Sequence, residues 1–282
     1  MCYVLFDVGG SKTRVGVSDD LSQLTNSVAF DTLQKSAEGI KKITEEAKKL
    51  AGDQKIRMVA GGIRGVLDGE KEGMIEDPGG VLTDWVDESI VSKLKKILGA
   101  EVFLENDAAL AGMGEAVYGA GEGHEIVVYH TISTGVGGAK IEEGMIDDYR
   151  QGFEPGHQIL DVDHTILGED VEPTLENLVS GGAIEARMGM KPYDIAQDDA
   201  LWDQLAYYLA HGLRNSILYW SPDVIVLGGS MIVGDPRILL DDIIKYTNEV
   251  LGEVADVPLI LDATLGDEGG LYGAMALLQQ KV

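Results

Sequence analysis

The chain has 282 residues, 45% of them hydrophobic and 6% aromatic, and a formal net charge of -26 at pH 7. Domains run to roughly 100–200 residues, so this length accommodates one large domain or two of middle size. The negative charge argues against nucleic acid and anionic membranes as partners, because binding either depends on Lys and Arg. A single cysteine, Cys2, excludes an internal disulfide and a cysteine-cluster zinc site, and no apolar run approaches the roughly 18 residues of a membrane span. We therefore expect a cytoplasmic protein.

Strands and helices alternate through the first hundred residues. Apolar runs bounded by glycine or polar residues predict strands, and a helix over residues 36–50, which Ser36 can cap, has its apolar side chains on one face. The predicted strands are 3–8, 13–17, 27–30, 56–60 and 102–104, with a second helix at about 86–98. This order favours an α/β fold.

The second part of the chain partly repeats this pattern. Strands predicted at 126–131 and 136–141 form a hairpin, as the strands near the N-terminus do. The other predicted elements are helices at 108–117, 198–220, 235–251 and 268–279, and strands at 224–227 and 259–261. We therefore expect two similar α/β lobes, each opened by a glycine-bearing hairpin, with phosphates clamped between them.

The first hairpin, over residues 4–17, turns at a pair of glycines. Gly9 and Gly10 have no side chain to keep a ligand away from the bend, so backbone N–H groups can point at a phosphate. Asp7 stands where the first strand enters the bend, in position to hold a metal that a nucleotide brings with it. An ordinary glycine turn is the alternative for this segment by itself.

Asn106 and Asp107 follow the buried strand at 102–104 and open a helix rich in alanine and glycine. Ligands of open α/β sheets bind at such carboxyl ends of strands. A carboxylate there can accept a hydroxyl proton while the neighbouring amide holds another hydroxyl of the same substrate. The alternative is that Asp107 only caps the helix.

Three later segments are further candidates for ligand contacts. Ser133-Thr134-Gly135-Val136-Gly137-Gly138 is a second hydroxyl-plus-glycine bend, although it lacks the Gly-Lys-Ser/Thr of a Walker A loop. Glu154-Pro155-Gly156-His157 and Glu176 lie in an acidic, irregular stretch whose carboxylates can accept hydrogen bonds from sugar hydroxyls. Residues 224–230 form a buried strand that ends in a glycine turn. A flexible turn, a solvated loop and a plain strand end are the respective alternatives.

Taken in order, these motifs resemble the ROK family of sugar kinases, part of the actin-like ATPase superfamily. The series is Asp-x-Gly-Gly-Ser-Lys, Glu-Asn-Asp-Ala, Ser-Thr-Gly-Val-Gly-Gly, Glu-x-Gly-His, Leu-Glu and Ile-Val-Leu-Gly-Gly-Ser, and it spans nearly the whole chain. The resemblance implies a two-lobed, ribonuclease H-like α/β fold with a mixed sheet in each lobe. We expect residues 1–107 plus 269–282 to form the N-terminal lobe and 108–268 the C-terminal lobe.

The resemblance also implies residue roles. Asp107 resembles the family's general base, and Asp7 would lie near Mg²⁺ through water. The nucleotide-binding residues implied are Asp7, Gly9, Gly10, Ser11, Lys12, Thr134, Gly135, Gly228, Gly229 and Ser230. The sugar-binding residues implied are Gly65, Asn106, Asp107, Glu154, His157 and Glu176.

The chain departs from the family pattern in two places. Many members carry a cysteine-rich zinc segment after Glu-x-Gly-His, but residues 158–175 contain no cysteine. We therefore predict no structural zinc, with Glu176 positioned by packing alone. Arg64 replaces the usual proline of a Gly-Ile-Pro-Gly turn near the sugar, which leaves the sugar open and favours an anionic or unusual substrate.

These observations predict an ATP- and Mg²⁺-dependent kinase that phosphorylates the primary 6-hydroxyl of a hexose, with glucose expected first. An N-acetylhexosamine, fructose or mannose kinase is the alternative within the class, and polyphosphate is an alternative donor. The alternative from another class is a sensor that binds a sugar or nucleotide without catalysis. Repressor members of the family carry a DNA-binding helix-turn-helix before the first strand, so we do not expect a repressor, and relatives are commonly homodimers.

Overall fold

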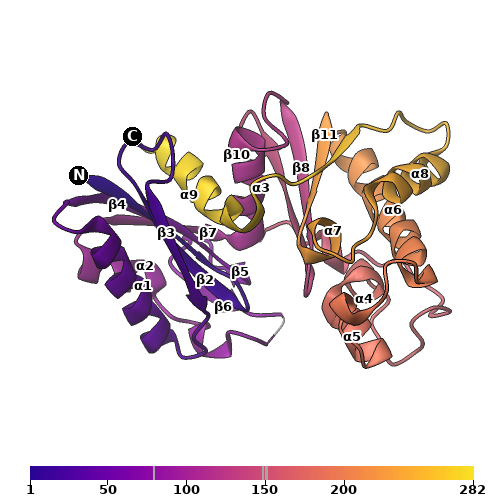
Figure 1. Cartoon of the computed structure of the whole chain (residues 1–282), viewed down its shortest axis with the longest axis horizontal. Coiled ribbons are helices and arrows are strands. Elements are labelled where there is room, and N and C mark those ends of the chain that lie inside the picture. The colour runs from indigo at the N-terminus through magenta and orange to yellow at the C-terminus, as the bar shows by residue number, and fades with distance from the viewer. Residues whose placement is uncertain (79, 148, 150–151) are drawn as a thin grey trace. The chain divides into compact units, whose positions relative to one another are not determined.

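The computed structural model describes residues 1–78, 80–147, 149 and 152–282. The chain divides into two compact units, whose elements are labelled in Figure 1. Unit 1 comprises Met1–Tyr118, Asp148–Gly152 and Asp267–Val282, and unit 2 comprises Gly119–Asp147 and Phe153–Gly266. None of the described helices combines the length and hydrophobicity that a membrane crossing requires.

Unit 1 is built on a mixed five-stranded sheet in the order β3-β2-β1-β4-β7. The strands are β1 (Cys2–Val8), β2 (Lys12–Ser18), β3 (Asn26–Asp31), β4 (Ile56–Ile63) and β7 (Glu101–Asn106). The first three strands run antiparallel, whereas β1, β4 and β7 run parallel. The carboxyl ends of these parallel strands therefore meet at one edge of the sheet, where α/β proteins bind ligands.

Helices cover both faces of this sheet (Figure 1). Helices α1 (Ser36–Ala51) and α2 (Ile90–Leu98) bury apolar side chains such as Ile40 and Leu94 in the core on one face. Helices α3 (Asp107–Tyr118) and α9 (Gly269–Gln279) pack on the other face. Their backbones approach so closely that a Cβ on Gly273 would lie 1.8 Å from the Leu110 carbonyl oxygen. Helix α3 therefore belongs to unit 1, although the sequence had assigned residues from 108 onward to the second lobe.

Unit 2 contains a second sheet of the same design, in the order β10-β9-β8-β11-β12. The strands are β8 (Ile126–Ile132), β9 (Val136–Glu142), β10 (Met145–Ile146), β11 (Val224–Gly228) and β12 (Leu259–Asp262). An antiparallel hairpin, β8–β9, again stands beside parallel strands. The helices are α4 (Leu175–Val179), α5 (Gly181–Met188), α6 (Ala200–Trp220), α7 (Ser230–Val233) and α8 (Leu240–Leu251). The predicted α/β fold with one mixed sheet in each half is confirmed.

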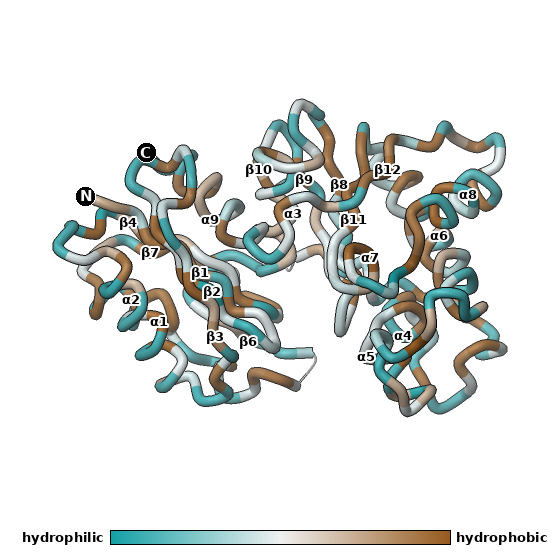
Figure 2. The backbone as a smooth tube through the Cα atoms, viewed as in Figure 1, coloured by the Kyte–Doolittle hydropathy of each residue, from teal (hydrophilic) through white to brown (hydrophobic). Residues whose placement is uncertain are grey.

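Hydrophobic residues follow the central strands β1 and β8, while the connecting loops are largely hydrophilic (Figure 2). On α6, Leu205, Leu209, Leu213 and Ile217 recur at i, i+4 spacing and are all buried, as on one face of a helix. The short elements were not predicted, because two to eight residues are too few to show a period. They are α4, α5, α7, β5 (Val66–Leu67), β6 (Met74–Glu76) and β10. The helices predicted from 86 and 235 begin instead at Ile90 and Leu240.

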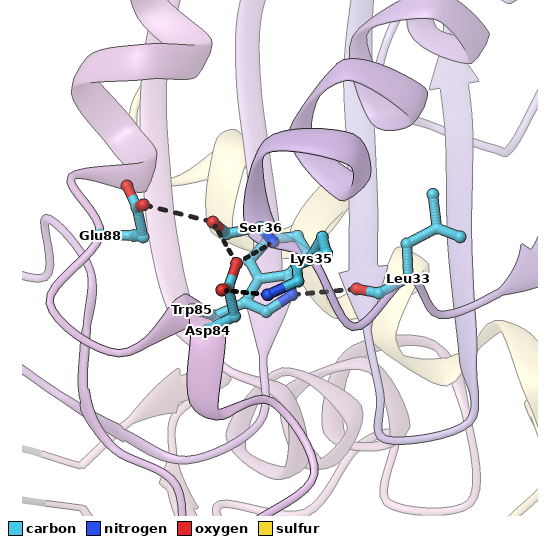
Figure 3. A network of polar contacts seen from close by, with 6 residues as sticks. All are labelled: Leu33, Lys35, Ser36, Asp84, Trp85 and Glu88. Carbon is cyan, nitrogen blue, oxygen red and sulfur yellow. Dashed lines mark hydrogen bonds and ion pairs between the residues drawn. The ribbon is translucent and has the colours of Figure 1, made fainter.

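The predicted capping of α1 by Ser36 is wrong. Ser36 is already helical, and its N–H donates to Asp84 Oδ2 over 2.9 Å (Figure 3). Asp84 belongs to a 3-10 turn, Thr83–Trp85, that lies between β6 and α2. The Trp85 indole N–H donates to the Leu33 carbonyl, which holds this turn against the start of α1. A carboxylate from a distant part of the chain therefore caps the helix.

Candidate active site

The bend between β1 and β2 is held by its own backbone. The Gly9 N–H donates to the Lys12 carbonyl over 3.0 Å, and the Thr32 hydroxyl donates to the Gly9 carbonyl over 2.8 Å. The N–H groups of Gly10 and Ser11 have no hydrogen-bond partner among the described residues. These two amides are thus available to an anion.

Lys12 lies beside this bend, but its ammonium group is 2.6 Å from the Asp31 carboxylate on the neighbouring strand. Both side chains are exposed. The pairing follows from the register, since Lys12 is directly opposite Asp31 in the β2–β3 ladder. Lys12 is therefore engaged with a surface carboxylate in this structure.

Asp7 is one residue from the end of β1, and its carboxylate is packed between glycines of two other elements. A Cβ on Gly270 would lie 2.7 Å from Asp7 Cγ, and one on Gly62 would lie 3.4 Å from Asp7 Oδ1. Burial, followed by the charge of Asp107, raises the pKa of Asp7 to about 7, while Arg14 acts in the opposite direction. Asp7 Oδ1 is buried and has no hydrogen-bond partner among the residues that the structure describes.

A buried carboxylate oxygen without a partner fits a cation held through water. Among the described residues no cluster of three His, Cys, Asp or Glu could hold a metal ion by itself. Mg²⁺ suits such a site, because it keeps several waters and takes one or two carboxylates together with substrate phosphates. The residues present therefore fit Mg²⁺ that arrives with a nucleotide, with Asp7 as its protein partner.

Asn106 and Asp107 lie where β7 leads into α3. The Asn106 side chain accepts a hydrogen bond from the Ala109 N–H at 3.0 Å and donates one to the Gly65 carbonyl at 3.2 Å. Asn106 is therefore the residue that caps α3, a role that the sequence had considered for Asp107. The same two bonds orient the Asn106 amide and tie it to Gly65.

The Asp107 carboxylate accepts a hydrogen bond from the Ala108 N–H at 2.8 Å. Burial raises the pKa of Asp107, although this hydrogen bond and the nearby Arg64 charge act in the opposite direction. A carboxylate of raised basicity can accept a proton more readily, as a general base must. The structure thus brings Asp7, Asn106 and Asp107 to the same edge of the unit 1 sheet.

In unit 2 the bend between β8 and β9 is held by the two short helices that were not predicted. The Gly181 N–H donates to the Ser133 carbonyl and the Gly182 N–H to the Thr134 carbonyl, both from the start of α5. The Val136 N–H donates to Glu176 Oε2 over 2.7 Å, from α4. Glu176 is therefore not positioned by packing alone, and the prediction on that point is wrong.

The other predicted residues of unit 2 surround this bend. Gly156 lies in a 3-10 turn, Pro155–His157, where a Cβ would be 2.4 Å from the Val136 carbonyl oxygen. This close approach brings the turn, with Glu154 before it and His157 at its end, to β9. Both of these side chains are exposed.

The turn after β11 is joined to the same bend by a hydrogen bond of 3.0 Å between the hydroxyls of Ser230 and Ser133. Gly229 has a φ of 87°, and a Cβ there would meet the Ile132 carbonyl oxygen at 2.3 Å. A Cβ on Gly228 would lie 2.4 Å from the Tyr129 hydroxyl oxygen. Glycine is thus required at both positions, because Ile132 and Tyr129 occupy the space that a side chain would need.

The segment without cysteines, 158–175, is organised by one carboxylate. Asp161 is 4% exposed and accepts hydrogen bonds of 2.8 to 3.0 Å from the N–H groups of Thr165, Ile166 and Leu167. The segment rejoins the core through the Leu175 N–H, which donates to the Gln158 carbonyl. Asp161 thus orders the first half of this segment through backbone hydrogen bonds.

Sequence reasoning missed three charged residues near the unit 1 site: Arg14, Asp77 and Asp267. Arg14 lies opposite Asp7 in the β1–β2 ladder and pairs with Asp267 at 2.9 Å. Asp77 pairs with Arg64. The position of Arg14 follows from the hairpin register and could have been found, whereas that of Asp77 depends on the tertiary structure.

The fold and these sites define a class: a two-unit α/β protein with a hydroxyl- and glycine-bearing bend in each unit. The protein resembles a ROK family glucokinase from Streptomyces griseus, solved in complex with glucose and AMPPNP, with a TM-score of 0.79 and 25% identity over 99% of this chain and 100% of that one. The sequence is 26% identical to a glucokinase from Thermotoga maritima over 98% of this chain and 96% of that protein. It is 27% identical to a fructokinase from Streptococcus mutans over 92% of this chain and 89% of that protein.

The sequence model of the ROK family matches residues 3–281. The chain therefore belongs to the ROK family, and it is a sugar kinase of that family. The expectation drawn from the order of its motifs is confirmed.

Proposed function

We propose that the chain transfers the γ-phosphoryl group of ATP to the primary 6-hydroxyl of a hexose, with glucose as the preferred acceptor. The observation that carries this proposal is the Asp107 carboxylate, whose pKa burial raises and which lies at the same sheet edge as Asp7 and the free amides of Gly10 and Ser11. A proton acceptor beside an anion-binding bend is the equipment that phosphoryl transfer to a hydroxyl needs.

Each group has a defined task in this reaction. Asp107 accepts the proton of the sugar hydroxyl while the hydroxyl oxygen attacks the γ-phosphorus and the bond to the β-phosphate oxygen breaks. The Asn106 amide, oriented by Ala109 and Gly65, holds a neighbouring sugar hydroxyl. When bound beside Asp7, Mg²⁺ supplies charge neutralisation at the phosphate oxygens.

The residues of unit 2 take the remaining ligand groups. We assign Glu154, His157 and Glu176 to sugar hydroxyls, because carboxylate and imidazole side chains accept or donate the hydrogen bonds that hydroxyls offer. Thr134 and Gly135 are assigned to phosphate, and Gly228, Gly229 and Ser230 to the adenosine side.

Fructose is the second candidate acceptor. The chain is as similar to a fructokinase, at 27% identity, as to a glucokinase, at 26%. The carboxylates assigned here bind hydroxyls of either sugar, so their presence does not separate the two.

The test is ADP release on a panel of glucose, fructose, mannose and N-acetylhexosamines, with ATP and Mg²⁺. Asp107→Asn is expected to lower kcat by about 10²–10⁴-fold, the usual contribution of a general base. Asp53→Asn makes the same chemical change at an exposed position and is expected to keep full activity. The kinase proposal is wrong if no sugar gives turnover above that of Asp107→Asn, and the glucose assignment is wrong if another sugar has the highest kcat/KM.

A further inference from the structure

Arg64 brings a positive charge to the phosphate bend of unit 1. It follows β4 directly, and its N–H donates to the Val8 carbonyl at 3.1 Å, so the chain at Arg64 stays beside the end of β1. A Cβ on Gly10 would lie only 2.5 Å from Arg64 Nη1. The guanidinium group therefore lies against the glycine of the bend, in space that any side chain at residue 10 would fill.

Asp77 holds the other side of the guanidinium group. Arg64 Nε is 3.3 Å from Asp77 Oδ1, and the Asp77 side chain is 1% exposed while that of Arg64 is 25% exposed. Asp77 is itself fixed, because its other oxygen accepts a hydrogen bond from the Leu82 N–H. This ion pair, which lacks hydrogen-bond geometry, places Asp77 on the Nε side of the guanidinium group, while Nη1 lies against Gly10.

The surroundings of this guanidinium group are otherwise acidic. Asp7 and Asp107 lie close enough to affect each other electrostatically, and the positive charge of Arg64 acts on Asp107. A phosphoryl group that enters between two carboxylates needs a compensating charge, and a guanidinium group binds phosphate oxygens in a bidentate manner. Lys12 is engaged with Asp31 and Arg14 with Asp267, which leaves Arg64 with its Nη1 edge on the bend itself.

We propose that the Arg64 guanidinium group binds the oxygens of the phosphoryl group during transfer, with Asp77 as the residue that positions it. This inference rests on the proposed kinase function. The sugar oxygen forms the new bond to phosphorus, ADP leaves with the electrons of the broken P–O bond, Asp107 takes the proton, and Arg64 pairs with the oxygens of the group in transit. Arg64 is then a catalytic residue at a position where the family pattern has proline.

The test compares wild type with the double variant Arg64→Gln/Asp77→Asn, which removes both charges and so leaves no unpaired buried carboxylate. Loss of a hydrogen bond to a charged group corresponds to about 10–100-fold, and we expect that loss in kcat, with KM for the sugar unchanged. Arg64→Lys keeps a charge and is expected to lose less. The control is Arg57→Gln. Arg57 is an arginine at the other end of β4 that stacks on Tyr3 of β1, and its loss is expected to change neither kcat nor the sugar KM.

A binding measurement separates contact with the phosphoryl group from a structural role. Calorimetry with ADP and aluminium fluoride, which mimics the group in transit, should show weaker binding to the double variant, whereas ADP alone should bind as in wild type. The inference is overturned if kcat and analogue binding are unchanged, or if KM for the sugar rises while kcat is kept, since Arg64 would then contact the sugar. A wild-type protein that releases no ADP with any sugar overturns the proposed function, and this inference with it.

Discussion

The two glycine bends have similar local sequences but different supports. The bend of unit 1, residues 9–12, has charged neighbours: Asp7, Arg64 and Lys12. The bend of unit 2, residues 133–136, is held by backbone N–H groups of α5 and by Glu176. The first has charged side chains of both signs beside it, whereas the second presents a fixed backbone with one carboxylate. Similar hairpins thus acquire different surroundings according to what packs against them.

The largest expected effect is a pH dependence of the stability of unit 2. Burial lowers the pKa of His130, on β8, to about 4 from its usual 6.5. With His130 neutral in both states, above pH 6.5, the free energy of unfolding is at its full value. It falls as the pH drops from 6.5 toward 4, because the unfolded chain takes up the proton first. The loss amounts to about 3 kcal/mol, from 1.36 kcal/mol for each pKa unit.

Urea unfolding from pH 7 to pH 4 measures this effect. Trp202 and Trp220 report on unit 2 and Trp85 on unit 1, so Trp85→Phe confines the fluorescence signal to unit 2. His130→Gln should flatten the pH dependence, while the same change at His124 should leave it as in wild type. An unaltered slope in His130→Gln would contradict the assignment.

The two bends can also be compared by adding one methyl group to each. At residue 10 the new Cβ would meet the Arg64 guanidinium group at 2.5 Å, and at residue 135 it would meet the Glu176 carboxylate at 2.6 Å. Gly10→Ala is expected to lower kcat with little change in sugar KM, whereas Gly135→Ala is expected to raise sugar KM. Each loss corresponds to a hydrogen bond with a charged group, on the order of 10–100-fold.

Steady-state kinetics on the best sugar of the panel measure both variants. The two bends differ as proposed if Gly10→Ala changes mainly kcat and Gly135→Ala changes mainly the sugar KM. If both variants changed the same constant by a similar factor, the two bends would not differ in the way that their neighbours indicate.

A smaller effect is expected at the segment without cysteines in unit 2. Asp161→Ala leaves three N–H groups without their acceptor and is expected to lower the free energy of unfolding by about 1–3 kcal/mol. Chemical denaturation measures the change, and Asp170→Ala, at an exposed position in the same segment, is the control. If both variants were equally stable, Asp161 would not be what orders this segment.

The smallest effect is expected at the carboxylate that caps α1 in unit 1. Asp84→Ala removes the acceptor of the Ser36 N–H, and loss of such a cap costs about 0.5–2 kcal/mol. Ser36→Ala should cost less, because the Ser36 N–H keeps its bond to Asp84. Thermal unfolding of the two variants decides which residue is the cap, and a greater loss in Ser36→Ala would reverse the assignment.

Much of the fold could be predicted because its signals are local. Both hairpins, the long helix α6 and the strand that leads to Asp107 are visible as apolar periods interrupted by glycine. The order of the motifs was sufficient to identify the family. The short helices α4 and α5 were missed, since their residues are held by contacts with the second bend rather than by a period of their own.

The sequence by itself determined the α/β class, the two hairpins and the motifs of the family, because those signals depend on neighbours along the chain. Only the tertiary structure decided that Asn106 caps α3, that Glu176 bonds to Val136, and that Asp84 caps α1. It also decided that Arg64 lies between Asp77 and Gly10. Except at Asn106, these contacts join residues from 13 to 54 positions apart in the chain, and no local pattern encodes which of many carboxylates will reach a given partner.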